Sequence, residues 1–399
     1  MVLIKTQPPR LSVVVSHPIQ HFCPLYRALA ADGRLDLKVF FASDAGKAPY
    51  FDPEFGRQMD WGADITDGFE HEFLPGFKTY DFVSEGRSPA LAKRLAEFNP
   101  DVVQLYGYGR KLSRQALLWA KRNRRQSLMV GDSELLRPRS ALTRTVKALT
   151  LPLILQIPNG FLTVGDENER YYAHYGVSRK RMSRSPIPID SMLFDEFLND
   201  RDSVRAKMRE AWGVDDNDVV FLAVGKTVPN KSHDHILEAM ARMPPTERKR
   251  AVAVFAGGGP GSEDLRILSE TLKVRSILAG FMRISDLVGA YLGADVLVQP
   301  SAAEAHALAI AEGVYAGLPI VLSDRVGSWG PTDDVRPRSN GLRYTYGDIA
   351  QLSGHLTEVV RDDALRRQLA NESWRIGRTR GLASSATSYV EAVLRATVG

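Results

Sequence analysis

The chain of 399 residues is long enough to form two domains of ordinary size, each with its own buried core. Hydrophobic residues make up 44% and charged residues 25% of the sequence, which are the proportions of a soluble globular protein. The single cysteine, Cys23, excludes an internal disulfide, and no segment near the N-terminus has the basic, apolar and small-residue order of a signal peptide. We therefore expect a cytoplasmic protein.

In the first half of the chain, short apolar runs alternate with helical patterns, which is the order that builds parallel βαβ sheets. These runs cover residues 11–15, 37–41, 102–105, 128–130 and 161–164. The apolar segment 148–157 contains Pro152 and is too short to cross a bilayer, so it is predicted to be a buried helix end.

The second half repeats the alternation, with apolar runs at residues 219–224, 251–255, 276–278, 296–298 and 320–322. The two prolines within residues 186–190 hold the chain extended and make this segment the predicted linker. The sequence therefore predicts an α/β protein with two doubly wound, Rossmann-like domains, residues 1–186 and 187–379.

Glu304 and Glu312 are separated by seven residues. If the stretch between them is helical, eight positions make a little over two turns, so both carboxylates lie on one side. A helix start offers unpaired N–H groups that suit a diphosphate, and carboxylates accept hydrogen bonds from sugar hydroxyls. The pair therefore indicates a nucleotide-sugar site, and the alternative is an amphipathic helix with two solvated glutamates.

Pro300 and Ser301 precede this pair, and Ala-Gly-Leu-Pro at 316–319 follows it before an apolar run. This order resembles the signature of the retaining GT-B glycosyltransferases of family 4. Residues 221–231 and 252–261 are similar to that family's Gly-Lys loop and glycine turn, so the resemblance covers roughly 215–375. It implies two domains that face a cleft, with a last helix at about 380–399 that crosses back to the first domain.

The resemblance also implies a donor site in the second domain. Glu312 is expected to bind the ribose, and Glu304 the hydroxyls of the donor sugar. Lys226 and Lys231 follow a strand, at the sheet edge where α/β folds bind ligands, and their charge would stabilise a departing diphosphate. Surface lysines are the plain alternative. Backbone N–H groups at the helix start are expected to help bind the diphosphate: those around His306, Ala307 and Leu308.

Glycine turns and two apolar side chains complete the predicted donor site. Gly225 follows one strand, and Gly257 with Gly258 follows the next. Phe281 and Met282 occupy the segment whose backbone meets the nucleobase in the resembled family. A purely structural role for the glycine turn, and a place in the core for the two apolar side chains, are equal alternatives.

In the first domain, His17 and His21 directly follow the first strand, where an acceptor and the transferred sugar are expected. Helix capping or packing is the alternative role for both. Asp132 follows a later strand, where relatives place a polar residue against the donor sugar. His233 and His235 form a His-x-His pair, but no third ligand is spaced nearby, so no metal site is expected.

These features predict a retaining glycosyltransferase that moves a hexose-like sugar from a nucleoside diphosphate, UDP or GDP, to an acceptor hydroxyl. Neither a metal nor another cofactor is expected. A sugar-nucleotide epimerase on the same fold, which would convert the donor without an acceptor, and a non-catalytic binding protein are the alternatives. The acceptor is a glycan, a lipid-linked sugar or a small molecule, with modified nucleic acid as a further alternative.

The charge of the chain is uneven, because residues 110–147 contain eleven Lys or Arg residues against Asp132 and Glu134, whereas the whole chain has a net charge of +5. Such a surface suits anionic lipid headgroups, a phosphorylated acceptor or nucleic acid. The predicted helix at 113–125 carries Leu117, Leu118 and Trp119 beside its basic residues, which is typical of an interfacial helix. Peripheral contact with the inner face of a membrane is therefore one interpretation, and a solvated basic surface is the other.

Overall fold

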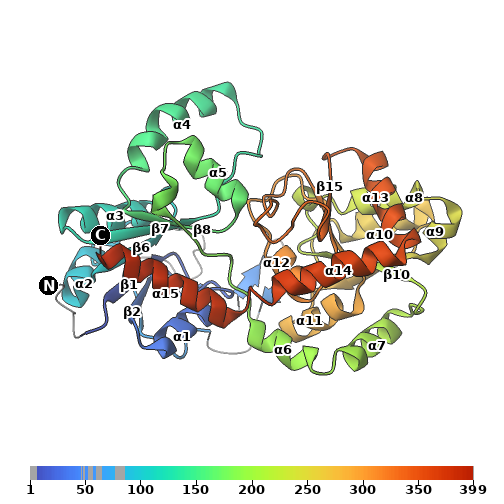
Figure 1. Cartoon of the computed structure of the whole chain (residues 1–399), viewed down its shortest axis with the longest axis horizontal. Coiled ribbons are helices and arrows are strands. Elements are labelled where there is room, and N and C mark those ends of the chain that lie inside the picture. The colour runs from blue at the N-terminus through green and yellow to red at the C-terminus, as the bar shows by residue number, and fades with distance from the viewer. Residues whose placement is uncertain are drawn as a thin grey trace.

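A computed structural model describes residues 7–45, 47, 50–52, 57–59, 65–76 and 86–398 of the chain. They form two parallel sheets surrounded by helices, side by side along the long axis of the molecule (Figure 1). The predicted α/β class with two doubly wound domains is confirmed. A separate antiparallel pair, β3 (Tyr50–Asp52) and β4 (Arg57–Met59), belongs to neither sheet.

The first sheet has seven parallel strands in the order β5-β2-β1-β6-β7-β8-β9. They are β1 (Arg10–Val15), β2 (Asp36–Phe41), β5 (His71–Phe73), β6 (Val102–Tyr106), β7 (Gln126–Gly131), β8 (Gly160–Thr163) and β9 (Met182–Arg184). The central strands are apolar runs because helices cover both faces of the sheet. The strand order reverses between β1 and β6, so the loop after β1 stands at the point where open α/β sheets bind ligands.

Five helices accompany this sheet in chain order: α1 (Cys23–Asp32), α2 (Leu91–Phe98), α3 (Lys111–Arg122), α4 (Ala141–Ile154) and α5 (Asp166–His174). Leu117 of α3 is predicted to lie on an exposed interfacial face, and this is wrong because Leu117 is buried in the core. Its neighbour Leu118 is exposed. The predicted buried helix end is also wrong for Leu149 and Leu153 of α4. Only a narrow face of α4 reaches the core, through Leu151.

The second sheet has six parallel strands in the order β12-β11-β10-β13-β14-β15. They are β10 (Val219–Val224), β11 (Ala251–Ala256), β12 (Ser276–Gly280), β13 (Val296–Gln299), β14 (Ile320–Ser323) and β15 (Gly341–Tyr344). Alternate residues of β10 enter separate cores on the two faces of the sheet: Val220 and Leu222 on one, Phe221 and Ala223 on the other. The order again reverses at a central pair, β10 and β13, which places the loop after β10 at a second switch point.

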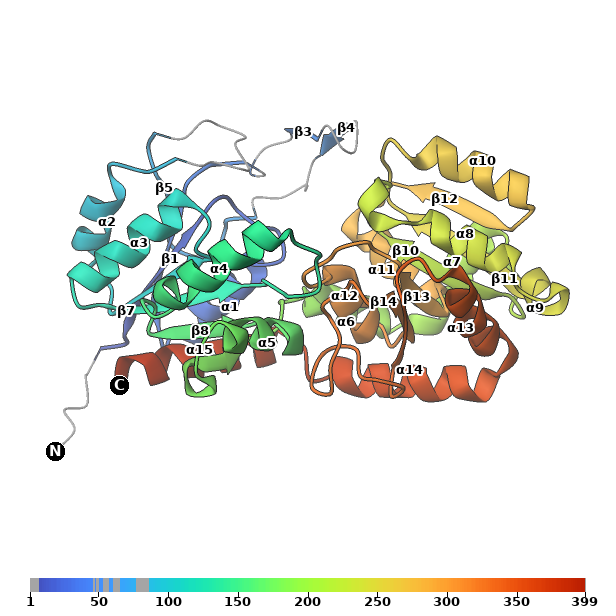
Figure 2. The same cartoon turned by 90° about the horizontal axis from the view of Figure 1, so that it is seen from above.

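The helices of the second half are α6 (Ser191–Leu198), α7 (Arg201–Trp212), α8 (Asp234–Ala241), α9 (Pro245–Arg250), α10 (Ser262–Leu272), α11 (Ile284–Gly293), α12 (Leu308–Tyr315), α13 (Ile349–Arg361) and α14 (Asp363–Gly377). The two views agree in placing α12 at the junction of the two halves (Figure 1, Figure 2). No helix within the described ranges combines the length and the apolar character needed to cross a membrane.

The chain passes between the two sheets twice. Residues 185–190 lead from β9 to α6, and residues 378–381 lead from α14 to the last helix, α15 (Leu382–Val398). Helix α15 returns to the first sheet, where Tyr389, Val390 and Val393 join the core that contains α1 (Figure 1).

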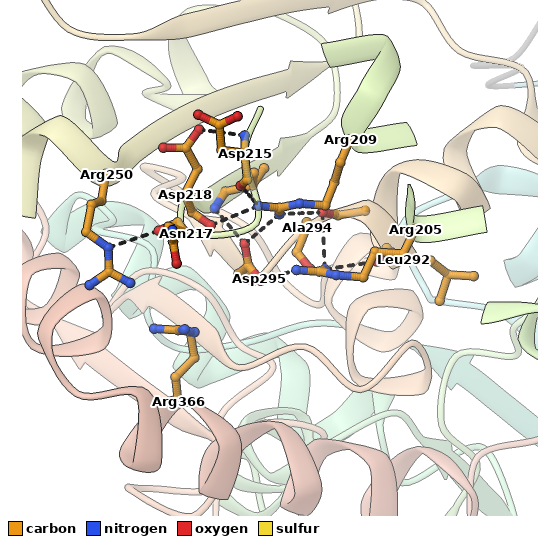
Figure 3. Close-up of polar contacts among 12 residues, drawn as sticks. Arg205, Arg209, Asp215, Asn217, Asp218, Arg250, Leu292, Ala294, Asp295 and Arg366 are labelled. Atoms are coloured by element: carbon orange, nitrogen blue, oxygen red, sulfur yellow. Dashed lines mark hydrogen bonds and ion pairs between the residues drawn. The ribbon is translucent and has the colours of Figure 1, made fainter. Parts of the chain in front are cut away.

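A buried ionic cluster fastens α7 to the second sheet (Figure 3). Arg209 is buried and donates to Asp295 at 3.0 Å, and Arg205 donates to the other oxygen of Asp295 at 2.7 Å. Asp295 also accepts from the N–H of Val220 at the start of β10, at 2.8 Å. Helix α7 is therefore held at the N-terminal edge of the sheet, opposite the edge where the strands end.

Candidate functional site

A cavity of about 420 Å3 lies between the two halves of the chain, at the carboxyl ends of their strands. The first sheet contributes His21 and the start of α1, and the second contributes the ends of β10 and β11 and the start of α12. The connecting segment contributes Ile189 and Asp190. Nine of the residues predicted from the sequence line this cavity: His21, Gly225, Lys231, Gly257, Phe281, Met282, Glu304, Leu308 and Glu312.

Lys231 and Glu304 form an ion pair on the wall of the cavity. The ammonium group of Lys231 donates to both carboxylate oxygens of Glu304, at 2.8 and 2.9 Å. Gln299 and Ser301 each donate to Oε2 of Glu304 at 2.8 Å, which fixes the carboxylate from the strand side. The charge of Glu304 is therefore compensated before any ligand binds, so it does not repel a phosphate nearby as a lone carboxylate would.

Two glycines allow the loops of the second sheet to come together around Lys231. Gly225 has a φ of +136°, and a Cβ atom there would lie 3.3 Å from Cε of Lys231. Gly257 has a φ of +146°, and a Cβ atom there would lie 1.9 Å from the carbonyl oxygen of Gly225. A side chain at either position would be strained, and at Gly257 it would separate the two loops. Both glycines therefore shape the site by close approach of the backbone.

Helix α12 begins at the cavity, with Ala307 as its N-cap. The N–H of Ala307 donates to the hydroxyl of Ser328 at 3.0 Å. The next residues, Leu308 and Ala309, line the cavity, and the first N–H groups of a helix have no partner within the helix. Their N–H groups and the positive end of the helix dipole are suited to an anion such as a phosphate.

Glu312 lies one turn further along α12, where it is partly buried and lines the cavity. Tyr291 of α11 donates to its Oε2 at 2.7 Å. Burial raises the pKa of Glu312 to about 7, although the hydrogen bond from Tyr291 opposes this shift. Such a carboxyl group ionises readily when donors such as sugar hydroxyls enter the cavity.

The glycosyl transferases group 1 family model matches residues 204–374, which contain all the second-domain residues described above. Residues 204–374 are thus similar to this family. The chain is 28% identical over 153 residues to the lipopolysaccharide glucosyltransferase WaaG of Escherichia coli, covering 38% of this chain and 40% of WaaG. It is 34% identical over 168 residues to a D-inositol 3-phosphate glycosyltransferase of Geodermatophilus obscurus, covering 39% and 36%. The chain thus matches about two fifths of the length of these relatives.

Solved structures are similar over nearly the whole chain. The crystal structure of Anabaena Alr3699/HepE in complex with UDP has a TM-score of 0.70 at 16% identity, covering 97% of this chain and 100% of that one. The structure of WaaG has a TM-score of 0.64 at 16% identity and covers 96% and 98%. The fold of this chain is that of GT-B glycosyltransferases.

The two first-domain histidines of this GT-B fold lie in different places. His21 lines the cavity between the domains, and burial followed by the charge of His17 lowers the pKa of His21 to about 4. His17 lines a separate pocket of about 180 Å3 with Arg110 and accepts or donates a hydrogen bond with Ser16 at 2.9 Å. Burial and the charge of Arg110 lower the pKa of His17 to about 4. Both imidazoles are therefore neutral near pH 7.

Six residues predicted for the site do not line the cavity in the described part of the chain: His17, Lys226, Gly258, Asp132, His306 and Ala307. Asp132 is exposed at the end of β7. Ala307 is buried beneath the start of α12, because the N-cap turns its side chain into the core. Lys226 is the second residue after β10, directly after Gly225.

His306 turns away from the cavity toward a buried pair of acids. Its Nε2 lies 3.2 Å from Asp333 and 3.5 Å from Asp334. Arg380 forms an ion pair with Asp334 at 2.9 Å. The three side chains of His306, Asp333 and Asp334 offer atoms within 4.8 Å of one another, as a cation site would, but Arg380 already neutralises part of their charge.

This acidic pair also joins the two domains. Asp333 accepts from the N–H of Asp166, at the start of α5 in the first domain, at 2.6 Å. Asp166 in turn accepts from the N–H of Thr332 at 2.9 Å and from Arg184 at 2.5 Å. A Cβ atom at Gly330 would lie 2.0 Å from the carboxylate of Asp166, so the loop approaches this closely only because it has a glycine there. The contact between the domains thus extends through Asp333 to His306.

The sequence pattern did not reveal several residues of the site. Tyr291 and Gln299 hold the two glutamates, but a tyrosine in a helix and a glutamine at a strand end carry no specific signal. Arg27 and Asp190 line the cavity only because the fold brings α1 and the connecting segment together. Asp333 is 27 positions from its partner His306, in a loop with no recognisable motif.

Proposed function

We propose that this chain transfers a sugar from a nucleoside diphosphate sugar to an acceptor hydroxyl, with retention of configuration at the anomeric carbon. One observation carries the proposal: the Lys231–Glu304 ion pair stands beside the first N–H groups of α12, in a cavity that both domains line. The similarity of residues 204–374 to the group 1 family and the complexes of Anabaena Alr3699/HepE with UDP and UDP-glucose support a nucleotide sugar as the donor.

The diphosphate would bind at the start of α12. The N–H groups of Leu308 and Ala309 would donate to it, and Lys231 would contribute its remaining ammonium proton. Negative charge gathers on the diphosphate as the bond to the sugar breaks, so these donors are worth most in the transition state. Lys231 has the position and charge to do this without a metal ion.

The two glutamates would hold the two ends of the donor. Glu312, which lines the cavity together with Phe281 and Met282, would accept from the ribose hydroxyls while the base lies against the apolar pair. Glu304 would accept from hydroxyls of the transferred sugar. His21 closes the cavity from the first domain and would meet the acceptor, which approaches from that side.

Retention follows if the acceptor hydroxyl attacks from the face that the diphosphate leaves. The departing phosphate oxygen then takes the acceptor proton, so no strong protein base is required. This agrees with the low pKa of His21, which keeps its imidazole neutral and able to accept a hydrogen bond from the incoming hydroxyl.

The test is a donor screen in the presence of EDTA. The chain is incubated with UDP- and GDP-sugars, with and without sugar, lipid-linked and small-molecule acceptors, and release of the nucleoside diphosphate is measured. The proposal is supported if release of the nucleoside diphosphate depends on the acceptor, and if the new glycosidic bond has the same anomeric configuration as the bond in the donor. Conversion of the donor sugar without release of diphosphate would instead indicate an epimerase, and an absolute requirement for a divalent cation would contradict the metal-free step.

A further inference from the structure

Helix α4 displays an apolar stripe to solvent. Leu142, Val146, Leu149 and Leu153 are 76%, 50%, 71% and 74% exposed. Their spacings of four, three and four residues place them on one face of a helix. Leu151, the buried residue of α4, lies on the opposite face. The stripe therefore points away from the core of the first domain, and four large apolar side chains in a row are unusual on a surface without a partner.

Positive charge accompanies the stripe. From Leu135 to Gly165 the sequence has no Asp or Glu, and the same segment contains Arg137, Arg139 and Arg144. Lys147 of this segment lies on the opposite face, one turn before Leu151, with its Nζ 5.8 Å from the ring centre of Tyr171. The acid just before this segment, Glu134, is buried and pairs with Arg139. Residues 135–165 thus offer no acid of their own to balance the charge of this surface.

A broad groove of about 890 Å3 runs along the base of α4. Arg137, Arg139 and Arg144 line it, together with Arg325 from the second domain. Arg325 donates to the carbonyl of Leu136 at 3.2 Å, so the groove spans both domains. The backbone carbonyl of Arg325 accepts from the N–H of Glu304 at 3.1 Å, which places this groove directly behind the wall of the donor cavity.

We propose that α4 and the arginine-lined groove beside it form a docking surface for a lipid bilayer with anionic headgroups. The four apolar side chains of α4 enter the interface between headgroups and acyl chains, and the arginines contact headgroup phosphates. In this proposal the apolar residues that enter the membrane belong to α4, whereas the sequence pattern indicated the helix at residues 113–125.

A second copy of the chain is a poorer occupant of this surface. Pairing two copies of this surface would bring Arg137 and Arg144 of each copy together, and the segment 135–165 offers no acid to compensate them. A four-residue stripe is also much smaller than the surface that a stable dimer buries, roughly 800 Å2 for each partner. Apolar side chains among cations suit an amphiphile with negative charge, and a nucleic acid would leave the stripe in water.

Flotation with vesicles tests the proposal without any sugar donor or acceptor, so its outcome is separate from that of the proposed function. The wild-type chain is expected to float with vesicles of phosphatidylcholine and phosphatidylglycerol, and to bind phosphatidylcholine alone at least roughly tenfold more weakly. The Leu149→Glu/Leu153→Glu and Arg137→Glu/Arg144→Glu variants are each expected to lose roughly tenfold or more of the binding. Ile267→Glu on α10 is the matched control, since Ile267 is 49% exposed, and should bind as wild type does.

A thiol probe reports the depth of α4 directly. Cys23 is the only native cysteine and is buried, so Leu149→Cys gives a chain with one exposed thiol. An environment-sensitive dye on this thiol is expected to shift to the blue on anionic vesicles, and the same dye at Ile267→Cys is expected not to shift. An unshifted dye at Leu149, or wild-type flotation of Leu149→Glu/Leu153→Glu, would overturn the proposal. So would a concentration-dependent dimer that Leu149→Glu abolishes, or DNA binding that only the charge variant loses.

Discussion

Lys231, in the loop after β10, donates hydrogen bonds to both carboxylate oxygens of Glu304, in the loop after β13 of the same sheet. The two residues are 73 positions apart and meet because β10 and β13 are neighbours in the second sheet. Their mutual neutralisation lets a carboxylate that is useful for binding sugar hydroxyls stand beside a site for phosphate.

Loss of Lys231 is predicted to harm donor binding in two ways. Lys231→Ala removes a charge-assisted contact to the diphosphate, worth roughly 1.5–3 kcal/mol, and leaves the carboxylate of Glu304 unpaired beside it. We expect UDP affinity to fall about tenfold or more in isothermal titration calorimetry, and turnover to be lost. The double variant Lys231→Ala/Glu304→Gln should bind UDP more tightly than Lys231→Ala. Equal affinity of the single and double variants would contradict this electrostatic account.

Nucleotide affinity is predicted to depend on pH through Glu312. Burial raises the pKa of Glu312 to about 7, and ribose hydroxyls donate stronger hydrogen bonds to the ionised carboxylate than to the protonated acid. Binding must therefore release a proton below pH 7, so affinity should rise as the pH increases toward about 7 and then level off. Calorimetry of UDP binding across this range measures the effect. The isosteric Glu312→Gln variant should bind more weakly with no such slope, and a wild-type profile that is flat below pH 7 would rule out the role of Glu312.

His306 is predicted to couple stability to pH. Burial by itself lowers the pKa of His306, but the hydrogen bond and charge of Asp333, with the charge of Asp334, raise it above the ordinary value. The folded state thus holds this proton more tightly, so the stabilisation is fully present below the unfolded pKa of about 6.5 and is lost as the pH rises through the raised folded pKa. Urea unfolding of wild type and His306→Gln should show a difference that shrinks as the pH rises. A difference that grows with pH would contradict this assignment.

The buried cluster around Asp295 is predicted to matter far more for stability than an exposed ion pair does. Asp295→Ala leaves the buried guanidinium of Arg209 without its carboxylate, and breaking such a pair costs roughly 3–5 kcal/mol of the free energy of unfolding. Glu263→Ala on α10 removes an exposed partner of Arg266 and should change the free energy of unfolding far less. Denaturant unfolding of both variants makes the comparison, and similar losses would show that the cluster is not uniquely important.

Much of the fold and of the cavity follows from local sequence patterns. Apolar runs reveal the central strands because helices bury them on both faces. The short edge strands β5, β9 and β15 were not predicted, since each has only three or four residues and little apolar signal. Glu304, Glu312 and Lys231 were predicted to share a site, and they do line one cavity, because strand-end loops of a parallel sheet gather at one edge.

The orientation of individual side chains was harder to predict. His306 lies next to residues that line the cavity, yet it faces Asp333 because the chain turns at the N-cap of α12. The apolar segment that includes Leu149 and Leu153 was predicted to be buried, because a sequence of leucines does not show which side of a helix meets the core. These choices are set by tertiary packing against α5 and the loop that contains Asp333, which local patterns do not encode.

The return of α15 to the first sheet determines how this protein can be divided. A fragment that ends at residue 185 would lack α15 and expose the surface of α1 that Tyr389 and Val390 cover. The complementary fragment would carry α15 without its partner. We therefore expect neither half to fold stably when the chain is divided at a single position. A fragment of residues 191–377, in contrast, contains the second domain without either connecting segment.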